Sequence, residues 1–496
     1  KVQQGLSDLV VNSPTLYIQE KVHPKALIDD LKRKSREHEQ EPEESTADLF
    51  GDFNGMPKDA DRTDFYQYDA NWQNRMILGD SLQVMASLAE REGLRGQVQC
   101  IYLDPPYGIK FNSNFQWSTT SRDVKYGKAE HITREPEQVK AFRDTWRDGT
   151  HSYLSYLRDR LLIARGLLCE SGSIFVQIGS ENVHRVRCLL EEVFGEENFV
   201  SEIIVVKSSG LGSKNIPQQT DYILYYSKSI NSLKYRQLFK QKSLEGEGAG
   251  AYQYAQSADG AVRRLTKNEI DNPELIPTVD EPLRFGDLTK PGPGSKYNLV
   301  AEGKTYTSKS RWWGVPKASL ERASKANRLF ATKRSISYKR FLSDWQAFPL
   351  TNTWTDTGTG SGLNKIYVVQ TDEKIVQRCL LMATDPGDLV LDPTCGAGTT
   401  AAVAENWGRR WITIDTSRVS LALARGRIMG ARYPYYMLAD SSEGQKKEAE
   451  ITWTAPSTAR TNGDIRFGFV YERVPHITLK SIANNAEIDV IWDRFQ

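Results

Sequence analysis

The stretch Ile101-Tyr-Leu-Asp-Pro-Pro-Tyr107 joins the end of an apolar run to a carboxylate, two prolines and an aromatic ring. The apolar run, which starts at Val98, predicts a buried strand. Because proline has no N–H to donate, the strand must end at Pro105, and the fixed φ of the two prolines holds Asp104 and Tyr107 in a rigid turn. The stretch therefore predicts a carboxylate and a ring at the carboxyl edge of a sheet, where α/β folds bind ligands.

This turn suits a planar ring that carries an amino group. The Asp104 carboxylate and the Pro105 carbonyl can accept hydrogen bonds from an exocyclic NH2, while the Tyr107 ring can stack on the face of a base. An ordinary proline turn at the end of a strand would have the same composition, so the stretch alone leaves both interpretations open.

A second apolar strand ends in a carboxylate and a glycine-rich loop, in the sequence Gly387-Asp-Leu-Val-Leu-Asp-Pro-Thr-Cys-Gly-Ala-Gly-Thr-Thr400. Gly396 and Gly398 permit close approach of the backbone to a ligand, and the helix that follows favours an anionic group at its N-terminus. The next strand ends in Asp415, which is placed to hold ribose hydroxyls. A plain loop is the alternative. The Gly-Lys-Ser/Thr ending of a phosphate loop is absent, which disfavours ATP.

A third carboxylate, Asp80, follows a short strand that begins at Arg75. A helix from Ser81 and the strand into Asp104 complete a βαβ unit, in which Asp80 and Asp104 are expected to be neighbours. Asp80 is either a cofactor contact or the N-cap of its helix, and the sequence does not decide between them.

Strands and helices alternate in two parts of the chain and predict an α/β fold with a doubly wound, mostly parallel sheet. The last two strands of the first part are expected to form a hairpin. A helix is expected near Pro24 to Arg36, in an arm with few core-sized residues. The expected divisions are an N-terminal arm and linker (1–65), a first α/β half (66–229), an inserted domain (230–350), a second α/β half (351–445) and an unassigned accessory segment (446–496).

The inserted region carries eleven Lys and Arg residues between Lys304 and Arg340, against one acid, Glu321, with aromatic residues between them. Basic residues mixed with aromatics suit a polyanion such as DNA, although a solvated basic face is the alternative. Neighbouring tryptophans on a strand point to opposite faces, so at least one of the pair at 312 and 313 is expected in the core. The candidate DNA contacts are Lys309, Arg311, Trp312, Trp313, Lys317, Lys333, Arg334, Lys339 and Arg340.

The composition predicts a globular, cytoplasmic protein. The chain has 496 residues, 39% of them hydrophobic, and no run long and apolar enough for a membrane span. Its five cysteines are scattered without a CxxC pair or a histidine cluster, so reduced thiols and no metal site are expected. The net charge of +2 hides the uneven distribution of basic residues, and the lack of an initiator Met suggests part of a longer protein.

The motif Asp104-Pro105-Pro106-Tyr107 resembles the Asp-Pro-Pro-Tyr motif of amino-methyltransferases, which methylate N6 of adenine or N4 of cytosine. The glycine-rich loop resembles their S-adenosylmethionine loop, usually Asp-Pro-Phe-x-Gly-Ser-Gly-Thr-Thr, with Thr394 and Ala397 as departures. The segment from Thr371 to Arg378 resembles the part that flanks the methionine moiety, with Ile375 in place of the customary proline. The likeness spans roughly residues 70 to 440.

The order of these motifs, catalytic turn first and cofactor loop last, is similar to that of permuted β-class enzymes, including type III restriction-modification Mod subunits. The resemblance implies a Rossmann-like S-adenosylmethionine-dependent methyltransferase fold with an inserted target-recognition domain. It implies that Asp104, Pro105, Pro106 and Tyr107 are catalytic. The cofactor-binding residues that it suggests, together with the loop argument, are Asp392, Pro393, Thr394, Gly396, Gly398, Thr399, Asp415, Asp80 and Lys374.

The function that follows is methylation of N6 of a flipped adenine in double-stranded DNA, as part of a restriction-modification or related defence system. Adenine is favoured because Asp, rather than Ser, opens the Pro-Pro-Tyr turn. Methylation of cytosine N4, methylation of a protein glutamine amide, and a catalytically silent DNA-binding module are the alternatives. A restriction or helicase subunit and a second copy of the chain are the further partners that the resemblance suggests, and no membrane partner is expected.

Overall fold

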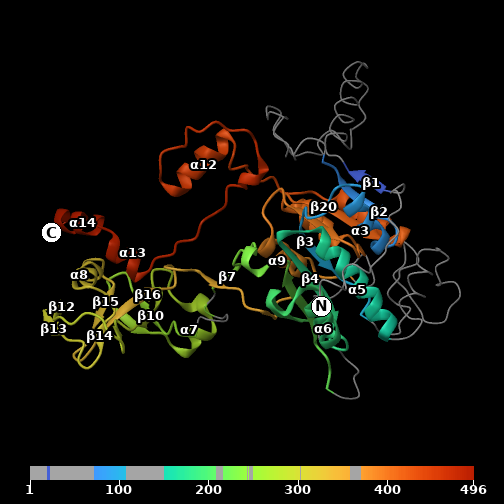
Figure 1. Cartoon of the computed structure of the whole chain (residues 1–496). Helices are drawn as coiled ribbons and strands as arrows, with labels where there is room; N and C mark the ends of the chain where they lie inside the picture. Colours follow the sequence, from blue (N-terminus) through green and yellow to red (C-terminus); the bar gives the residue numbers. More distant parts are fainter. Residues whose placement is uncertain are drawn as a thin grey trace. The chain divides into compact units, whose positions relative to one another are not determined.

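The computed structural model describes residues 72–107, 150–207, 216–242, 244, 250–301, 303–357 and 370–495, and the backbone strand β1 (Gln19–Val22) (Figure 1). The chain divides into two compact units. Unit 1 comprises Lys1–Leu238 and Thr351–Tyr471, and unit 2 comprises Phe239–Leu350 and Glu472–Gln496. The helix expected near residues 24–36 lies outside the described residues, but β1 lies within the expected N-terminal arm and pairs with the edge of the sheet.

Unit 1 is built on one nine-stranded sheet with the order β1-β2-β20-β19-β3-β4-β6-β5-β18. The five strands from β2 to β4 in that order are parallel, and β6 is antiparallel to both of its neighbours. The expected hairpin is therefore confirmed between β5 and β6. The strands are β2 (Asn74–Leu78), β3 (Val98–Leu103), β4 (Leu168–Gly179), β5 (Phe199–Val206), β6 (Thr220–Ser227), β18 (Thr353–Trp354), β19 (Leu389–Asp392) and β20 (Arg410–Asp415).

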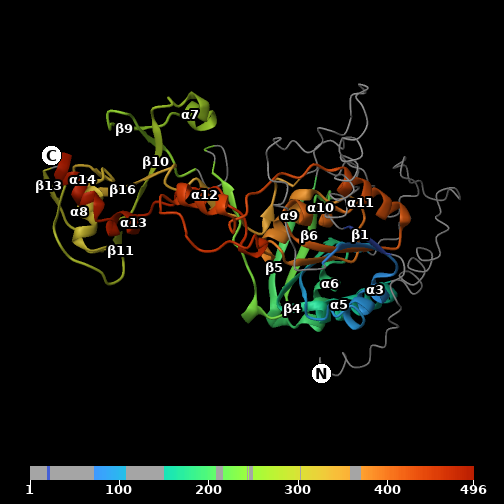
Figure 2. The same cartoon turned by 90° about the horizontal axis from the view of Figure 1, so that it is seen from above.

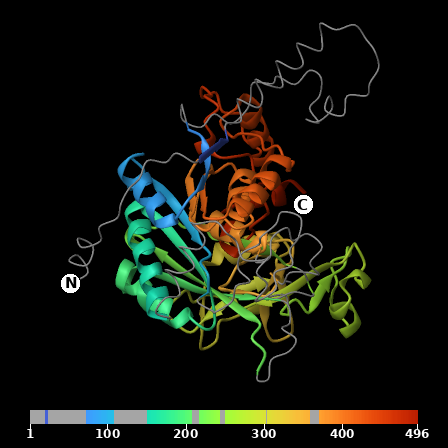
Figure 3. The same ribbon diagram turned by 90° about the vertical axis from the view of Figure 1, so that its right-hand side faces the viewer.

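Helices cover both faces of this sheet, which makes the fold doubly wound. Figures 2 and 3 show α3, α5 and α6 on one side of the sheet, and Figure 2 shows α9, α10 and α11 on the other. Apolar side chains of α5, such as Tyr153, Leu157 and Leu161, are fully buried against the strands. The helices are α3 (Ser81–Glu90), α5 (Thr150–Leu167), α6 (Val183–Phe194), α9 (Glu373–Ala383), α10 (Thr399–Asn406), α11 (Arg418–Gly430) and α12 (Ser442–Thr452).

One neighbour relation predicted from the sequence is wrong. Strands β2 and β3 do not pair, because β20 and β19 from the second α/β half lie between them. Asp104 therefore has Asp392, at the end of β19, as its neighbour, and Asp80 lies beside Asp415 instead. Strands of the second α/β half pair with the first half on both sides, β20 with β2 and β19 with β3, and the junction of β19 and β3 is the topological switch point of the fold.

Unit 2 contains a five-stranded antiparallel sheet in the order β15-β16-β10-β8-β9, with smaller two-stranded pairs beside it. Helix α8 packs on α13 and α14 from the end of the chain, so the expected accessory segment 446–496 is shared between the units. The elements are β7 (Phe239–Gln241), β8 (Tyr254–Gln256), β9 (Val262–Arg264), α7 (Lys267–Asp271), β10 (Glu281–Gly286), β11 (Thr289–Lys290), β12 (Leu299–Ala301), β13 (Lys304–Tyr306), β14 (Trp312–Trp313), α8 (Lys317–Lys325), β15 (Leu329–Ala331), β16 (Ile336–Phe341), β17 (Ala347–Pro349), α13 (Leu479–Asn484) and α14 (Glu487–Phe495).

None of the helices in the described part of the chain has the length and apolar content needed to span a membrane.

Candidate active site

Four aspartates predicted as site residues lie at one edge of the sheet of unit 1. Asp80, Asp415, Asp392 and Asp104 end or directly follow the parallel strands β2, β20, β19 and β3. Since the carboxyl ends of parallel strands meet at the same edge, the structure brings the Pro-Pro-Tyr turn and the glycine-rich loop together at the switch point. The two motifs, almost three hundred residues apart in sequence, form one site.

Asp104 is held by two threonines from the second α/β half. Its backbone N–H donates to Thr394 Oγ1 (2.9 Å), and its Oδ2 accepts from Thr371 Oγ1 (2.8 Å). Among the described residues, neither Asp104 Oδ1 nor the Pro105 carbonyl has a hydrogen-bond partner. These two acceptors are therefore available to a ligand that carries an amino group.

The pKa of Asp104 is raised to about 7, because burial in the protein disfavours its charged form. The hydrogen bond from Thr371 opposes this shift, the carboxylates of Asp221 and Asp392 add to it, and the positive charge of Lys207 opposes it. Although the Asp104 side chain keeps some accessible surface, protein surrounds it closely. Its carboxylate form, which accepts hydrogen bonds at both oxygens, therefore becomes the main species only above neutral pH.

Tyr107 is fixed from several sides. Its hydroxyl donates to Asp221 Oδ2 (3.0 Å) and accepts from Gln177 Nε2 (2.8 Å), while its backbone carbonyl accepts from Asn182 Nδ2 (2.7 Å). Burial raises the pKa of Tyr107 well above its usual value, so the hydroxyl stays protonated and remains a donor. A Cβ at Gly179 would lie 2.9 Å from Tyr107 Cδ2, so only glycine leaves room for the ring there.

The residues around Asp104 and Tyr107 that the sequence reasoning missed are Thr371, Gln177, Asp221, Lys207 and Asn182. Gln177 interrupts the apolar run of β4, and Asp221 lies near the start of the apolar strand β6. Both residues are buried. A polar residue in a strand that is buried on both faces needs a partner, and this was the signal that could have identified them.

The glycine-rich loop turns tightly after β19. Gly396 and Gly398 have φ values of 52° and 69°, which favour glycine. A Cβ at Gly398 would lie 2.6 Å from the Cβ of Ala424, so glycine also permits close packing of the loop on α11. Asp392, at the start of the loop, is buried and accepts from Thr394 N (2.9 Å), and burial raises its pKa to about 6. Asp392 therefore shapes the loop from inside.

Asp415 ties the loop to the next strand. Its carboxylate accepts from Gly396 N (2.9 Å), Ser417 N (2.8 Å) and Ser420 Oγ (2.7 Å), and burial raises its pKa. The backbone of Thr416 is a fourth hydrogen-bond partner of this carboxylate, so a ligand hydroxyl would share an acceptor position with the protein. The loop backbone and the start of α10 at Thr399 thus fit an amino acid joined to a nucleoside.

Two other predicted cofactor contacts have protein partners. Asp80 caps α3 by accepting from Leu82 N (2.8 Å), and both of its oxygens accept from Arg160, at 2.9 and 2.7 Å. The capping interpretation of Asp80 is therefore the one that the geometry supports. Lys374 lies in the first turn of α9, where its Nζ donates to the carbonyl of Asp356 (3.2 Å).

Two of the nine candidate DNA contacts in unit 2 are corrected. Trp313 is 1% exposed, packs in the core of the unit and donates its indole N–H to Tyr297 O (2.9 Å). Lys339 is 3% exposed, and its Nζ donates to Gln256 Oε1 and Asn327 Oδ1. Neither side chain can reach DNA. The burial of Trp313 confirms the prediction that at least one of the paired tryptophans is in the core, and Trp312 is half-buried.

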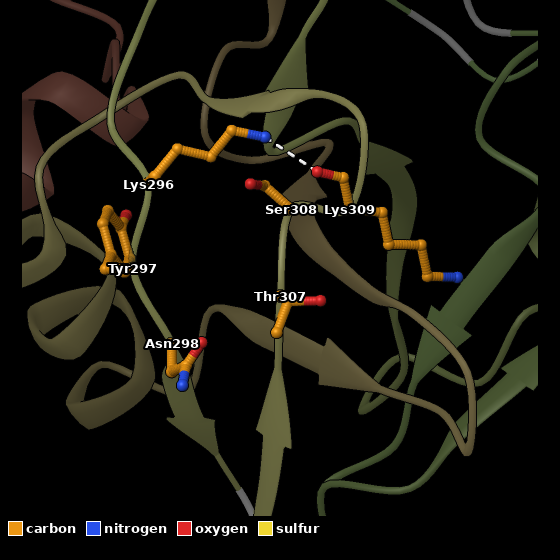
Figure 4. Close-up of a pocket in the computed structure, with 6 residues that line it drawn as sticks. All are labelled: Lys296, Tyr297, Asn298, Thr307, Ser308 and Lys309. Carbon is orange, nitrogen blue, oxygen red and sulfur yellow. Dashed lines mark hydrogen bonds between the residues drawn. The ribbon is translucent and has the colours of Figure 1, made fainter.

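The other six cationic candidates are exposed: Lys309, Arg311, Lys317, Lys333, Arg334 and Arg340. Arg311 is partly engaged by the Thr289 carbonyl, and Lys317 is 3.6 Å from Glu321. A cavity of about 340 Å³ lies beside Lys309 and is lined by Lys296, Tyr297, Asn298, Thr307, Ser308 and Lys309 (Figure 4). Lys296 Nζ donates to the Lys309 carbonyl (2.7 Å) and lies 4.8 Å from the Trp312 ring centroid, so it shapes the loop.

A doubly wound sheet with a glycine-rich loop and an Asp-Pro-Pro-Tyr turn at its switch point defines the class of S-adenosylmethionine-dependent methyltransferases. Within this class, the chain belongs to the DNA methylase family of N6 and N4 methyltransferases, whose family model matches residues 98–425. The match runs from β3 to α11 and includes both motifs. The cofactor of the family is S-adenosylmethionine.

Curated relatives include both type II and type III enzymes. The chain is 27% identical to the type II methyltransferase M.EcaI of Enterobacter cloacae, over 73% of this chain and 71% of the relative. It is 23% identical to the StyLTI Mod subunit of a type III restriction-modification enzyme from Salmonella typhimurium, over 86% of this chain and 64% of the relative. It spans 48% of the HindVI Mod subunit from Haemophilus influenzae, at 25% identity.

Similar solved structures include M1.HpyAVI bound to S-adenosylmethionine, at 13% identity and a TM-score of 0.34, covering 71% of this chain and 98% of that one. A DNA modification methylase of Thermus thermophilus, TTHA0409, complexed with S-adenosylmethionine is 15% identical, with a TM-score of 0.33, and covers 72% of this chain and 93% of that one.

Proposed function

We propose that this chain methylates N6 of adenine in double-stranded DNA. The observation that carries the proposal is Asp104 at the switch point, with Oδ2 occupied by Thr371 and Oδ1 available. An amino group placed there can donate to Oδ1 and to the Pro105 carbonyl. An aspartate, rather than a serine, opens the Pro-Pro-Tyr turn, which the family resemblance associates with adenine.

The cofactor is expected to bind against the glycine-rich loop at the carboxyl edge of the sheet. Asp415 would accept from the ribose, the backbone of Gly396 and Gly398 would lie against the cofactor, and the start of α10 at Thr399 would favour its carboxylate. Lys374 belongs to the segment that would flank the methionine moiety. When bound, S-adenosylmethionine supplies the methyl group on its sulfonium.

Asp104 and Tyr107 would act on the target base. Since N6 lies inside the duplex, the adenine must leave the base stack, and the Tyr107 ring offers a surface on which it can stack. Asp104 and the Pro105 carbonyl would orient the amino group and stabilise the positive charge that develops on its nitrogen during transfer. The nitrogen would take the methyl group directly as the S–CH3 bond breaks and the sulfonium becomes a neutral thioether, so no covalent intermediate with the protein is needed. The methylated ammonium is acidic enough that a weak base can remove its proton.

Unit 2 is proposed as the target-recognition domain. Its exposed cations, including Lys333, Arg334 and Arg340, can neutralise DNA phosphates. Trp312, which directly follows the exposed Arg311, keeps accessible surface. The named relatives that are Mod subunits suggest a partner subunit of a restriction-modification enzyme. A helicase subunit and a second copy of the chain are suggested by the family resemblance alone, and a DNA substrate would place the activity in the cytoplasm.

Mass spectrometry of nucleosides tests the proposal. Unmethylated double-stranded DNA is incubated with the protein and methyl-labelled S-adenosylmethionine and then digested. Label in N6-methyladenine is the expected result. Label in N4-methylcytosine would reject adenine as the target, and label in a protein glutamine but in no nucleoside would reject DNA as the substrate. The absence of any label would support a catalytically silent DNA-binding module.

A further inference from the structure

We propose that Gln177, in β4, is a positioning residue for the reaction, because its amide sets the direction of the hydroxyl hydrogen bonds that fix both Tyr107 and Asp104. The inference rests on the proposed function of the Asp104 site. Gln177 belongs to neither sequence motif, and it is only 6% exposed.

The Gln177 amide nitrogen faces two hydroxyls. Nε2 donates to Tyr107 Oη (2.8 Å) and to Thr371 Oγ1 (3.3 Å). A hydroxyl that accepts a hydrogen bond keeps its own proton for another acceptor. The Tyr107 proton is accordingly directed to Asp221. The Thr371 hydroxyl lies 2.8 Å from Asp104 Oδ2 and 3.5 Å from Gln177 Oε1, so its proton is directed to Asp104, the nearer acceptor. One side chain therefore directs two hydroxyl protons towards two carboxylates.

The orientation of the amide follows from a third partner. Gln177 Oε1 accepts from the hydroxyl of Tyr102, a buried residue whose pKa is raised well above its usual value by burial, so that it stays a donor. With the amide reversed, Oε1 would face Tyr107 and Thr371 and compete with the carboxylates for their protons. In the observed orientation every group in the chain Asp221–Tyr107–Gln177–Thr371–Asp104 has a partner, and the Tyr102 hydroxyl holds Oε1 in place.

The consequence for the reaction lies in Asp104. The Thr371 hydrogen bond favours the charged carboxylate and holds Oδ2, which leaves Oδ1 to accept from the target amino group. The charged and titratable groups that act on this side chain come from all surrounding elements: Asp221, Asp392, Lys207, Tyr102, Tyr107 and Tyr153. Loss of the Thr371 donor, directly or through Gln177, should raise the pKa of Asp104 above about 7.

The test compares four variants. Gln177→Glu exchanges the donor for an acceptor of the same size, and Thr371→Val removes the hydroxyl while keeping the shape. Thr371→Ser retains the hydroxyl and serves as the rescue. Gln99→Glu is the matched control, because Gln99 is also a buried glutamine, on the neighbouring strand β3, but its Nε2 donates to the backbone carbonyls of Ser171 and Ala383, away from the catalytic turn.

The pH dependence of kcat is the main readout. We expect Gln177→Glu and Thr371→Val to lower kcat at pH 7 at least tenfold and to move the rising limb of the profile to higher pH by about one unit, with cofactor affinity within threefold of the parent. Thr371→Ser and Gln99→Glu should keep the position of the parent's rising limb. An unshifted limb in both Gln177→Glu and Thr371→Val would overturn the inference.

A second readout needs no turnover. Because the pKa of Asp104 is higher in the folded than in the unfolded chain, the folded state binds its proton more tightly, and stability relative to Asp104→Asn should fall as pH rises from about 4 to about 7. In a Gln177→Glu background this window should extend to higher pH, measured as the difference in thermal midpoint with and without Asp104→Asn. An unchanged window would contradict the inference. An inactive parent with a shifted window would refute the proposed function but support the hydrogen-bond chain.

Discussion

Replacement of Asp104 with alanine is expected to lower the rate of methyl transfer to DNA by a factor of at least a thousand. In the proposed mechanism, the variant loses the acceptor that would orient the amino group and the negative charge that would stabilise the developing positive charge on nitrogen. Removal of one preorganised electrostatic group from an active site typically costs a hundred- to a thousandfold, and loss of orientation adds to this. Single-turnover transfer of labelled methyl groups to DNA measures the effect.

Asp104→Asn tests the role of the negative charge, because it removes the charge and keeps the shape of the side chain. It keeps the size of the side chain and one oxygen, but it presents an NH2 group that cannot accept from the target, so we expect a loss of about a hundredfold. Both variants should bind S-adenosylmethionine within about threefold of the parent, because Asp104 contacts the loop only through its backbone N–H to Thr394. Parental rates in both variants would show that the catalytic residue lies elsewhere.

Removal of the two cations at the turn between β15 and β16 is expected to change the salt dependence of DNA binding. Lys333 and Arg334 are exposed, and the turn that carries them is closed by Thr332 and Ser335. Each phosphate contact contributes about −0.9 to the slope of log K against log salt concentration. The double variant Lys333→Ala/Arg334→Ala should therefore have a slope shallower by about two units and bind more weakly at low salt by one to two orders of magnitude, without a change in sequence preference.

Fluorescence anisotropy at several salt concentrations measures the slope of DNA binding, and Lys339→Met provides the control. Lys339 lies in the same segment, but it is buried between Gln256 and Asn327, so its loss should leave the salt slope unchanged and lower the thermal midpoint of the protein. Equal slopes for the parent and the double variant would remove this turn from the DNA surface. A shallower slope for Lys339→Met would contradict its burial.

The local elements of the site were predictable from the sequence. The apolar runs into Asp104, Asp392 and Asp415 are short, and proline or glycine ends two of them, so strand, turn and helix were each expected within a few residues of their observed bounds. The meeting of the two motifs at the switch point followed from their permuted order. The strands, turns and helix depend on residues that are close together in the chain, whereas the meeting of the motifs was expected from the family resemblance.

The errors concern relations between distant residues. Asp80 was expected beside Asp104, but β19 and β20, more than two hundred residues later, lie between their strands. A pattern of alternation shows that strands are parallel and leaves open which strands pair. Lys339 was assigned to DNA with the rest of its basic segment, and the sequence does not reveal that Gln256 and Asn327 hold its side chain. Gln177 was missed for the same reason, since its role depends on Thr371, 194 residues away.

The central claim is that the carboxyl ends of β20, β19 and β3 form a methyltransferase site. Isothermal titration of the protein with S-adenosylmethionine tests this claim most directly. The parent is expected to bind one cofactor per chain. Asp415→Ala should bind at least tenfold more weakly, because it removes the acceptor proposed for the ribose and the hydrogen bond that holds Gly396 N. An absence of binding by the parent, or equal binding by the parent and Asp415→Ala, would contradict the account.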